Sequence, residues 1–306
     1  MQEAIEAMKI AFTQLSSGDV DVPVRTNLAV SKQTRSLIMP VSITGYSTFG
    51  LKAVSLTSDN ADRGLPMIHG LMLLFDCTTG EPRCLIDGEF LTALRTGAAS
   101  GLATDLLANP DASHLVVFGS GKQATTQVEA VVTVRPIEAV TVVSRNPQRA
   151  ADFCRNLQQF GDFDVTCTSD STTIAQSDVI CTATPSIEPL FAGSALPEQC
   201  HINAVGSYRK DMCEIEPEIL STMSIVVDQR EASLTEAGEI VQAIRCQAIS
   251  ESDVIELGIL LSSGEAIGIN KRTLFKSVGN AVQDLVIADA VFSRANRLEI
   301  GRQIEL

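Results

Sequence analysis

The apolar positions of this chain fall into two successive patterns, and each pattern predicts its own sheet. Up to about residue 87, apolar runs are separated by turn-rich segments without helices between them, which predicts a strand-rich region with a separate sheet. Between residues 115 and 228, apolar runs alternate with helical segments, which predicts a parallel sheet. Asn109-Pro110-Asp111 marks the boundary between the two regions.

Helical spacing of apolar residues frames the strand-rich region. Segment 3–16 predicts an amphipathic helix, and a helix rich in small residues is expected at 88–107. A long, mainly apolar helix at 280–296 is expected to return and pack on the first sheet. The predicted strands are 22–30, 36–39, 50–56, 71–76 and 83–86 in the first region and 115–118, 139–143, 164–168, 178–184, 201–207 and 224–228 in the second.

A glycine-rich turn in the second region carries the clearest functional signal. The strand at 115–118 is followed by Gly119-Ser120-Gly121-Lys122-Gln123-Ala124, a helix-length segment and the strand at 139–143. This strand–turn–helix–strand unit contains G-x-G-x-x-A, a dinucleotide-binding fingerprint. Gly119 can adopt the tight turn, Gly121 lets a pyrophosphate approach the backbone, and the helix N-terminus offers free N–H groups. The alternative is a purely structural glycine turn.

The end of the next strand indicates which dinucleotide binds. An NAD site usually has Asp or Glu there to bind the ribose 2′-hydroxyl, whereas this strand ends in Ser144-Arg145-Asn146. Arg145 can pair with a 2′-phosphate and stack on adenine, and Ser144 and Asn146 can donate hydrogen bonds to the phosphate. The sequence therefore predicts NADPH in preference to NADH. The alternative is that Arg145 is an ordinary surface residue.

Composition limits the class of protein and its partners. The chain has 306 residues, of which 45% are hydrophobic and 20% charged, an ordinary composition for a globular protein of two domains. A net charge of −14 argues against nucleic acid or an anionic membrane as a partner. The first residues lack a basic start and an apolar core, and no apolar run approaches bilayer length, so neither a signal peptide nor a membrane span is expected.

Cysteine and histidine usage predicts a reducing, cytoplasmic environment and no metal site. The eight cysteines are scattered without a C-x-x-C pair, mostly in apolar stretches, which is typical of small buried hydrophobic residues. The three histidines lie far apart in the sequence, and nothing resembles a zinc motif.

Short motifs occur along nearly the full length of the chain. They are Val22-Pro23-Val24-Arg25, Leu37-Ile38-Met39-Pro40, Gly50-Leu51-Lys52, Gly64-Leu65-Pro66 before Gly70, Thr92-Ala93-Leu94-Arg95-Thr96, the glycine turn at 119–124, Asn203-Ala204-Val205-Gly206-Ser207 and Phe275-Lys276-Ser277-Val278-Gly279. Together these motifs resemble the ornithine cyclodeaminase/mu-crystallin family. The resemblance implies an α/β protein with a Rossmann-type, doubly wound parallel sheet at 112–278. Segments 1–111 and 279–306, including the C-terminal helix, would form a second, α+β domain for substrate binding and dimerisation, so a homodimer is expected.

The resemblance also implies a small α-amino or α-imino acid substrate, with Arg25, Lys52 and Arg95 holding its carboxylate. The physical chemistry agrees, because a desolvated carboxylate needs charge-assisted donors and a cation inside an apolar element is costly unless an anion is bound. The alternative for each cation is a structural ion pair with an Asp or Glu. Lys52, Arg95, Glu231 and Asp211 are the catalytic candidates, and for the two acids the alternative is an ordinary surface carboxylate.

The predicted cofactor site draws on the ends of several strands. The carboxyl ends of the strands face the ligand in a doubly wound sheet, and the family motifs extend the set beyond the glycine turn. The predicted cofactor-binding residues are Thr96, Gly119, Ser120, Gly121, Lys122, Gln123, Ala124, Ser144, Arg145, Asn146, Thr182, Ala183, Thr184, Val205, Gly206 and Ser277.

Departures from the family pattern indicate which branch the chain resembles. Ornithine cyclodeaminases carry an Asp just after a V-G-G turn, whereas Tyr208 follows Val205-Gly206-Ser207 in this chain. Segment 205–212 resembles instead the mu-crystallin and cyclic-ketimine-reductase branch, with Lys210 in place of the usual Pro. The chain also starts directly in its first predicted helix, where relatives usually have a short strand before it.

The function implied by this branch is NADPH-dependent reduction of cyclic imino acids: Δ1-pyrroline-2-carboxylate to L-proline and Δ1-piperideine-2-carboxylate to L-pipecolate. Hydride would pass from the nicotinamide to C2 of a protonated C=N bond, and the protein would contribute orientation and electrostatics. The alternatives are an ornithine cyclodeaminase, an alanine-type amino-acid dehydrogenase and, in a different class, a non-catalytic NADPH-dependent small-ligand-binding protein of the mu-crystallin type.

Overall fold

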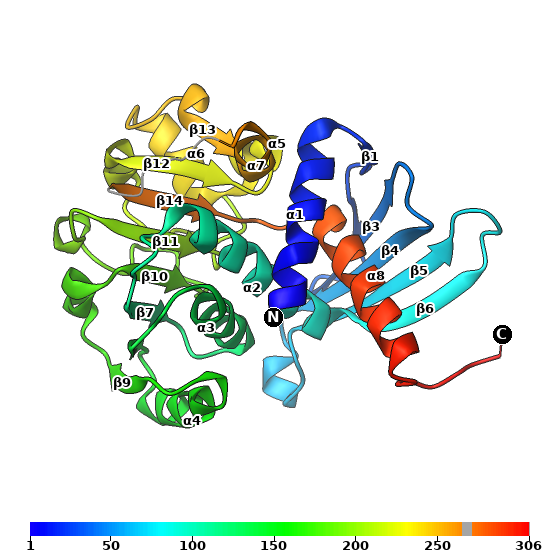
Figure 1. The fold of residues 1–306 in the computed structure, drawn as a ribbon, viewed down its shortest axis with the longest axis horizontal. Coiled ribbons are helices and arrows are strands. Elements are labelled where there is room, and N and C mark those ends of the chain that lie inside the picture. Colours follow the sequence, from blue (N-terminus) through cyan, green and yellow to red (C-terminus); the bar gives the residue numbers. More distant parts are fainter. Residues whose placement is uncertain (265–270, 306) are drawn as a thin grey trace. The chain divides into compact units, whose positions relative to one another are not determined.

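The computed structural model describes residues 1–264 and 271–305, which form two compact units (Figure 1). Unit 1 contains Met1–Lys9 and Thr96–Gly279, and unit 2 contains Ile10–Arg95 and Asn280–Leu306. Helices α1 (Gln2–Ser17) and α2 (Gly88–Leu107) contribute residues to both units. This division assigns the second half of α2 to unit 1, whereas the bounds predicted from the sequence place all of α2 in the substrate-binding domain.

Small residues explain why the second half of α2 belongs to unit 1. A Cβ on Gly97 would lie 2.5 Å from the carbonyl oxygen of Thr126, so glycine allows α2 to approach α3 (Lys122–Val134) closely. A Cβ on Gly101 would similarly meet the side chains of Ile5 and Ala130. The small residues that the sequence places in this helix therefore serve backbone packing within unit 1.

Unit 2 consists of a six-stranded antiparallel sheet and the C-terminal helix. The strand order is β1-β3-β4-β5-β6, with β2 paired to β3. Helix α8 (Ala281–Arg297) contacts β3, β4 and β5, as the sequence predicted (Figure 1). The strands are β1 (Val20–Asp21), β2 (Thr26–Ala29), β3 (Thr34–Ile43), β4 (Thr48–Thr57), β5 (Ile68–Asp76) and β6 (Pro82–Asp87).

Alternation of side chains determines which face of this sheet is buried. Gly50 and Lys52 of β4 pair with Leu74 and Met72 of β5, and all four residues are buried on one face. A Cβ on Gly50 would clash with Met72 and approach Leu285 of α8 to 3.2 Å. Glycine at this position therefore lets α8 pack closely on the sheet.

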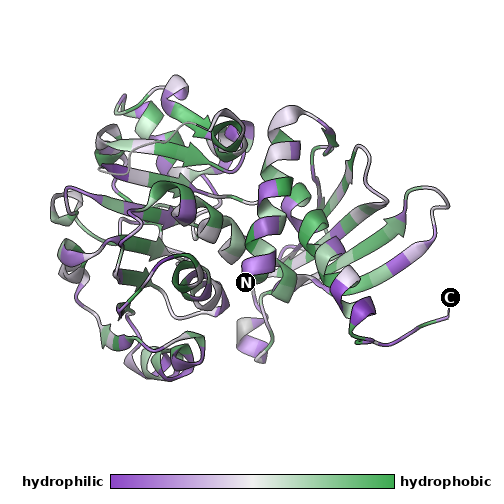
Figure 2. Cartoon of the chain, in the orientation of Figure 1, coloured by the Kyte–Doolittle hydropathy of each residue, from purple (hydrophilic) through white to green (hydrophobic). Residues whose placement is uncertain are grey.

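Unit 1 contains an eight-stranded parallel sheet in the order β13-β12-β14-β11-β10-β7-β8-β9. Its strands are predominantly hydrophobic, as expected for a sheet covered on both faces (Figure 2). Together with the α+β unit 2, this sheet confirms the predicted fold class. The strands are β7 (His114–Phe118), β8 (Ala139–Val143), β9 (Asp164–Thr168), β10 (Val179–Thr182), β11 (Cys200–Ala204), β12 (Met223–Val227), β13 (Val254–Glu256) and β14 (Arg272–Lys276).

The remaining helices of unit 1 connect these strands. None of the helices in the described parts of the chain is long and apolar enough to cross a bilayer. Besides α3, the helices are α4 (Pro147–Leu157), α5 (Arg230–Glu236), α6 (Gly238–Arg245) and α7 (Leu257–Ser263).

The structure corrects two details of the predicted strands. The expected strand at 22–30 is interrupted, because only β1 and β2 pair with β3 there and Pro23 has no N–H to donate to a ladder. Strands β13 and β14 were not predicted, and β14 lies between β11 and β12 near the middle of the sheet. Its five residues begin with Arg272 and end with Lys276, so its apolar run is too short to recognise in the sequence.

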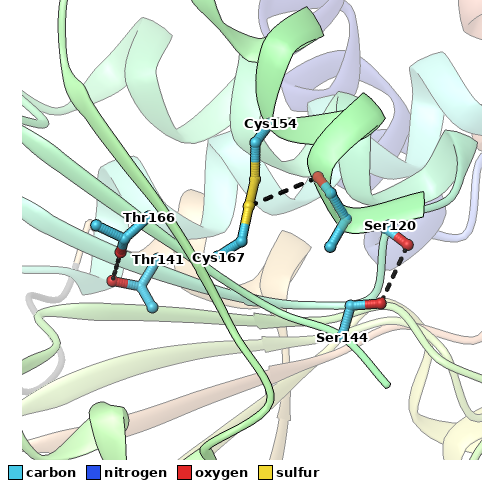
Figure 3. The surroundings of a disulfide bond; sticks show 7 residues. Ser120, Thr141, Ser144, Cys154, Thr166 and Cys167 are labelled. Carbon is cyan, nitrogen blue, oxygen red and sulfur yellow. Dashed lines mark hydrogen bonds between the residues drawn. A yellow bond between two sulfur atoms is a disulfide. The ribbon is translucent and has the colours of Figure 1, made fainter. Parts of the chain in front are cut away.

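Cysteine pairing also differs from the expectation of eight free cysteines. Cys154 of α4 and Cys167 of β9 form a disulfide (Figure 3). The two residues are 13 positions apart without a motif, so their pairing depends on α4 packing against β9. Cys181, Cys200 and Cys213 are buried as expected, whereas Cys77 and Cys246 are exposed.

Candidate functional site

The glycine-rich turn lies where the strand order of the parallel sheet reverses. β7 leads to β8 and β9 on one side, while its other neighbour, β10, leads to β11. Gly119, just after β7, has φ 111°, and a Cβ there would lie 2.7 Å from the carbonyl oxygen of Ala183, just after β10. Both the conformation and the space therefore require glycine. Ligands bind at such a switch point in open α/β sheets.

The start of α3 fits a dinucleotide pyrophosphate. Its N-cap, Gly121, makes no side-chain cap hydrogen bond, so no N-cap side chain competes for the first N–H groups of the helix. Apart from Gly121 itself and the adjoining backbone, no atom of the described residues lies within 4 Å of the position that a Gly121 Cβ would take, so the turn is open there. Gln123 Oε1 is buried and lacks a hydrogen-bond partner within the described residues. An anion bound at this turn would face backbone donors and an unscreened helix end.

The residues predicted to select the dinucleotide lie beside this turn. Ser144 Oγ is 3.4 Å from Ser120 Oγ, which joins the end of β8 to the glycine turn (Figure 3). Arg145 is exposed at the end of β8. The side chain of Asn146 accepts a 3.0 Å hydrogen bond from the Arg149 N–H and so caps α4. Asn146 therefore also has a structural role that the sequence analysis did not assign to it.

The remaining predicted cofactor residues are distributed over other parts of unit 1. Thr182 ends β10, while Val205 and Gly206 follow the neighbouring strand β11. Ser277 follows β14 and donates a 2.8 Å hydrogen bond to the buried Asp228. Thr96 is buried in α2.

In unit 2, Lys52 of β4 and Arg95 of α2 converge on one acidic residue of α8. Lys52 Nζ donates to Asp284 Oδ1 and to Thr92 Oγ1, each at 2.7 Å. Arg95 Nε lies 3.5 Å from the same Asp284 Oδ1, and Arg95 Nη1 donates to Gln283 Oε1 at 3.0 Å. The sequence identified the two cations but missed Asp284 and Gln283, which lie 232 and 188 residues away from their partners.

The charges of this cation cluster, Lys52, Arg95 and Asp284, do not balance. The exposed fractions of the three residues are 4%, 8% and 1%, and their formal charges sum to +1. Burial lowers the pKa of Lys52, Asp284 opposes this shift and Arg95 adds to it. The predicted alternative of an ion pair is therefore present in the structure, yet one carboxylate cannot neutralise two cations. The cluster is electrostatically complementary to one further small carboxylate.

Among the other predicted substrate and catalytic residues, Arg25 belongs to unit 2, and Asp211 and Glu231 belong to unit 1. Arg25 is half-buried in the segment between β1 and β2, and its role stays a prediction. Asp211 is exposed and accepts two hydrogen bonds from Arg209, at 2.9 and 3.0 Å, which lower its pKa. Glu231 is exposed in the first turn of α5. Asp211 is therefore ionised at neutral pH and holds no proton to donate.

The sequence analysis assigned no role to three charged residues of unit 1, although one of them, Lys276, lies in a family motif. Glu214, Glu239 and Lys276 are fully buried and linked to one another near the carboxyl ends of the parallel strands. Within the described residues, no group of three or more His, Cys, Asp or Glu side chains is arranged to hold a metal ion. No local pattern marks such buried charges, because their burial depends on distant elements that pack around them.

Comparison with known proteins identifies the family. The chain matches the ornithine cyclodeaminase/mu-crystallin family over residues 1–299. A Δ1-pyrroline-2-carboxylate reductase of Bacillus cereus is 36% identical, with 100% of this chain and 95% of the relative covered. The structure of Thermococcus litoralis Δ1-pyrroline-2-carboxylate reductase in complex with NADH and L-proline has a TM-score of 0.92 and 34% identity, covering 99% of this chain and 95% of that chain.

A second similar structure extends the comparison to another enzyme of the same fold. An archaeal alanine dehydrogenase dimer with bound NAD has a TM-score of 0.91 and 30% identity, covering 100% of this chain and 94% of that chain. The glycine turn and the two buried cations belong to motifs that resemble this family, and the full-length matches point to the same family. This chain belongs to the ornithine cyclodeaminase/mu-crystallin family.

Proposed function

We propose that this protein reduces cyclic imino acids with NADPH, converting Δ1-pyrroline-2-carboxylate to L-proline and Δ1-piperideine-2-carboxylate to L-pipecolate. It is a nicotinamide-dependent oxidoreductase that acts on C=N bonds, like its reductase relatives. The observation that carries the proposal is the cation cluster of Lys52, Arg95 and Asp284, because its net charge of +1 suits one substrate carboxylate. The complex of the Thermococcus litoralis enzyme with L-proline supports the same class of substrate.

The proposed reaction uses both units. Unit 1 binds the dinucleotide, which supplies a hydride when bound. In unit 2, Lys52 retains one N–H beyond those donated to Asp284 and Thr92, and Arg95 Nε makes no hydrogen bond within the described residues, so these donors can bind the carboxylate. When the hydride and its electron pair reach C2 of the protonated C=N bond, the π electrons move to nitrogen. The product is a secondary amine, and one proton is consumed for each hydride transferred.

The preference for NADPH over NADH is part of the proposal. It is supported by the end of β8, which carries Ser144, Arg145 and Asn146 and no acid to bind a ribose 2′-hydroxyl. Arg145 is exposed and directly follows Ser144 in the sequence. The hydroxyl of Ser144 lies next to the glycine turn. The two similar structures contain NADH or NAD, so cofactor choice must be measured for this chain itself.

The decisive experiment follows the cofactor absorbance with purified protein. Loss of NADPH with Δ1-pyrroline-2-carboxylate, and formation of L-proline, is the expected result. Ammonia release from ornithine would support a cyclodeaminase instead, oxidation of L-alanine would support a dehydrogenase, and NADPH binding without turnover would support a binding protein. Δ1-pyrroline, which has the same ring without the carboxylate, is the matched control and should be reduced far more slowly. Equal rates for the two imines would contradict the role given to the cation cluster.

We also propose that the protein forms a homodimer through the outer face of the unit 2 sheet. Leu71, Leu73 and Leu85 lie on this face, because Leu73 pairs with Leu85 across β5 and β6 and alternates with the buried Met72. Leu71 and Leu85 are 48% and 53% exposed, which is unusual for large apolar side chains in a sheet. A second copy of the chain would cover this apolar face, and one similar structure is a dimer.

The oligomeric state can be tested with two matched substitutions. Leu85→Lys should convert the dimer to a monomer in light scattering, because it places a charge in the apolar face. Leu298→Lys, just after α8, changes a residue of similar exposure (55%) outside the sheet and should leave the dimer intact. A monomeric wild-type protein at micromolar concentration would contradict the proposal.

A further inference from the structure

Three fully buried charged residues in unit 1 have no part in the reaction described above. Glu214 lies in the segment after β11, Glu239 in the first turn of α6, and Lys276 at the end of β14. All three have exposed fractions of 0%. β10, β11 and β14 are neighbours in a parallel sheet, so their carboxyl ends lie along one edge. This is the edge at which the doubly wound fold binds its cofactor.

The carboxylate of Glu214 joins the turns that follow β10 and β11. Its Oε1 accepts hydrogen bonds from the Thr184 N–H and hydroxyl, both at 2.8 Å. Its Oε2 accepts from the Thr182 hydroxyl and the Gly206 N–H, both at 2.9 Å, and from the Ser207 N–H at 3.2 Å. These five donors come from residues in or next to the predicted cofactor site, so one side chain positions both turns.

Glu239 and Lys276 complete the cluster from the other side. Glu239 Oε1 accepts from the Glu214 N–H at 2.9 Å, while Glu239 Oε2 accepts from the Ser207 hydroxyl and lies 3.3 Å from Lys276 Nζ. Lys276 Nζ also donates to the Ser207 carbonyl and hydroxyl oxygens, at 2.7 and 2.6 Å. The acidic cluster of Glu214, Glu239 and Lys276 therefore has two carboxylates and one ammonium group, a formal net charge of −1.

Within the described part of the chain, no second cation neutralises this net charge. Among the residues that the structure describes, Lys276 is the one cation within ion-pair distance of either carboxylate. Burial raises the pKa of Glu214 and Lys276 opposes this shift, while donors to both carboxylate oxygens stabilise the ionised form. An uncompensated buried negative charge is costly unless a positive group comes close to it. The cluster has one acid more than it has bases, and the hydrogen bonds that stabilise the carboxylates leave their net charge unchanged.

We propose that the acidic cluster positions the nicotinamide-binding turns and, through its net charge of −1, favours the oxidised, positively charged nicotinamide over the neutral reduced ring. This inference rests on the proposed function, because it assigns the ends of β10 and β11 to the nicotinamide. The same charge stabilises the positive charge that develops when hydride leaves. Glu214 and Glu239 are positioning residues, since they act through Thr184, Gly206 and Ser207.

The test compares the affinities of the oxidised and reduced dinucleotide, without substrate. Glu214→Gln and Glu239→Gln each bring the net charge of the cluster to zero. Each variant should therefore raise the ratio of the dissociation constant of the oxidised dinucleotide to that of the reduced dinucleotide. The expected rise is about tenfold, which one unit charge gives at a separation on the order of 10 Å and an effective dielectric constant of about 20. Asp178→Asn is the matched control, because Asp178 lies at the opposite, amino ends of the strands and accepts hydrogen bonds from the Ser113 and His114 N–H groups. This variant should leave the ratio of the two dissociation constants unchanged.

A shorter acid separates the charge from the geometry. Glu214→Asp retains the negative charge but cannot reach both turns, so both affinities should fall while their ratio stays that of the wild type. Equal weakening of both forms in Glu214→Gln and Glu239→Gln would mean that the cluster has a structural role alone, and would overturn the inference. A wild-type protein that binds neither form would refute the proposed function itself. If the wild-type protein binds both forms and the two Gln variants leave the ratio of dissociation constants unchanged, only the electrostatic role of the cluster is refuted.

Discussion

Each unit of the molecule contains one buried cluster of three charges, and the two clusters have opposite net charge. In unit 2, Lys52 and Arg95 share Asp284, which leaves +1. In unit 1, Glu214 and Glu239 share Lys276, which leaves −1. The proposed reaction offers each cluster a ligand of the opposite sign, a substrate carboxylate for the first and an oxidised nicotinamide for the second. A buried imbalance of charge thus indicates the charge of the ligand that each cluster is suited to bind.

The two clusters also differ in how fully their polar atoms are used. Glu214 accepts five hydrogen bonds, and Lys276 donates to both oxygens of Ser207. Arg95 Nε, by contrast, makes no hydrogen bond within the described residues and lies only within ion-pair distance of Asp284. A saturated cluster can hold turns rigidly and act at a distance, whereas an unsaturated cluster can bind a ligand directly. The following predictions test this difference.

The largest effect is expected from removing the acid of the cation cluster. Asp284→Asn should lower the free energy of unfolding by about 3–5 kcal/mol, because it leaves two buried cations without their partner. Saturating cyclopentanecarboxylate should restore part of this loss in urea denaturation, since the added anion replaces the missing charge. Asp289→Asn, in the same helix and half-buried, accepts a hydrogen bond from Thr48 and is the control. A variant as stable as the wild type would show that the cations do not need Asp284.

Removing a cation should affect substrate and leave the cofactor unchanged. Lys52→Ala should lower kcat/KM for Δ1-pyrroline-2-carboxylate by roughly 10²-fold or more, because the carboxylate loses a desolvated charged partner. The dissociation constant for NADPH should stay close to that of the wild type, since the predicted phosphate sites lie in unit 1. Wild-type turnover in this variant, or loss of NADPH binding instead, would remove Lys52 from the substrate site.

A smaller effect is expected at the other end of the cofactor site, far along the sheet from the acidic cluster. Arg145→Ala should raise the KM for NADPH about tenfold or more through loss of a charge-assisted contact to the 2′-phosphate, with little change for NADH. Arg155→Ala removes an exposed arginine of α4 that pairs with Asp152 and should change neither. Equal changes for the two cofactors in Arg145→Ala would contradict the assignment of NADPH.

The smallest effect concerns pH, and its sign differs between the clusters. Lys52 has a lowered pKa, so its side chain is charged below that pKa and neutral above it. Binding of cyclopentanecarboxylate should therefore weaken as the pH rises, and this weakening should begin below the pH at which an ordinary lysine loses its proton. Lys52→Arg should move this alkaline limit to higher pH.

Glu214 has a raised pKa, so its negative charge is lost as the pH falls, and preference for the oxidised dinucleotide should weaken on the acidic side. Calorimetric titrations across pH check both limits.

The sequence predicted those features that depend on neighbouring residues. The β7–α3–β8 unit was found because its apolar strands and glycine turn are contiguous, and Gly119 has the positive φ that the motif implies. Helices α2 and α8 were placed almost to the residue, α2 as a long run of small and apolar residues and α8 through the helical spacing of its apolar residues. Lys52 and Arg95 were identified as unusual cations through the family resemblance, and the fold class followed from the change in pattern between the two regions.

Tertiary structure alone decided the partners of the charged residues. Asp284 is in an ordinary helical position in the sequence, yet it lies 232 residues from Lys52 and 2.7 Å from its Nζ. Strand β14 lies between β11 and β12, and Lys276 at its carboxyl end contacts Glu239 and Ser207. A local pattern reports burial and periodicity, because these depend on a few adjacent side chains. Pairing of buried charges depends on which distant elements pack together, so the sequence determined the two sheets and the glycine turn, and folding determined the sign of the charge inside each unit.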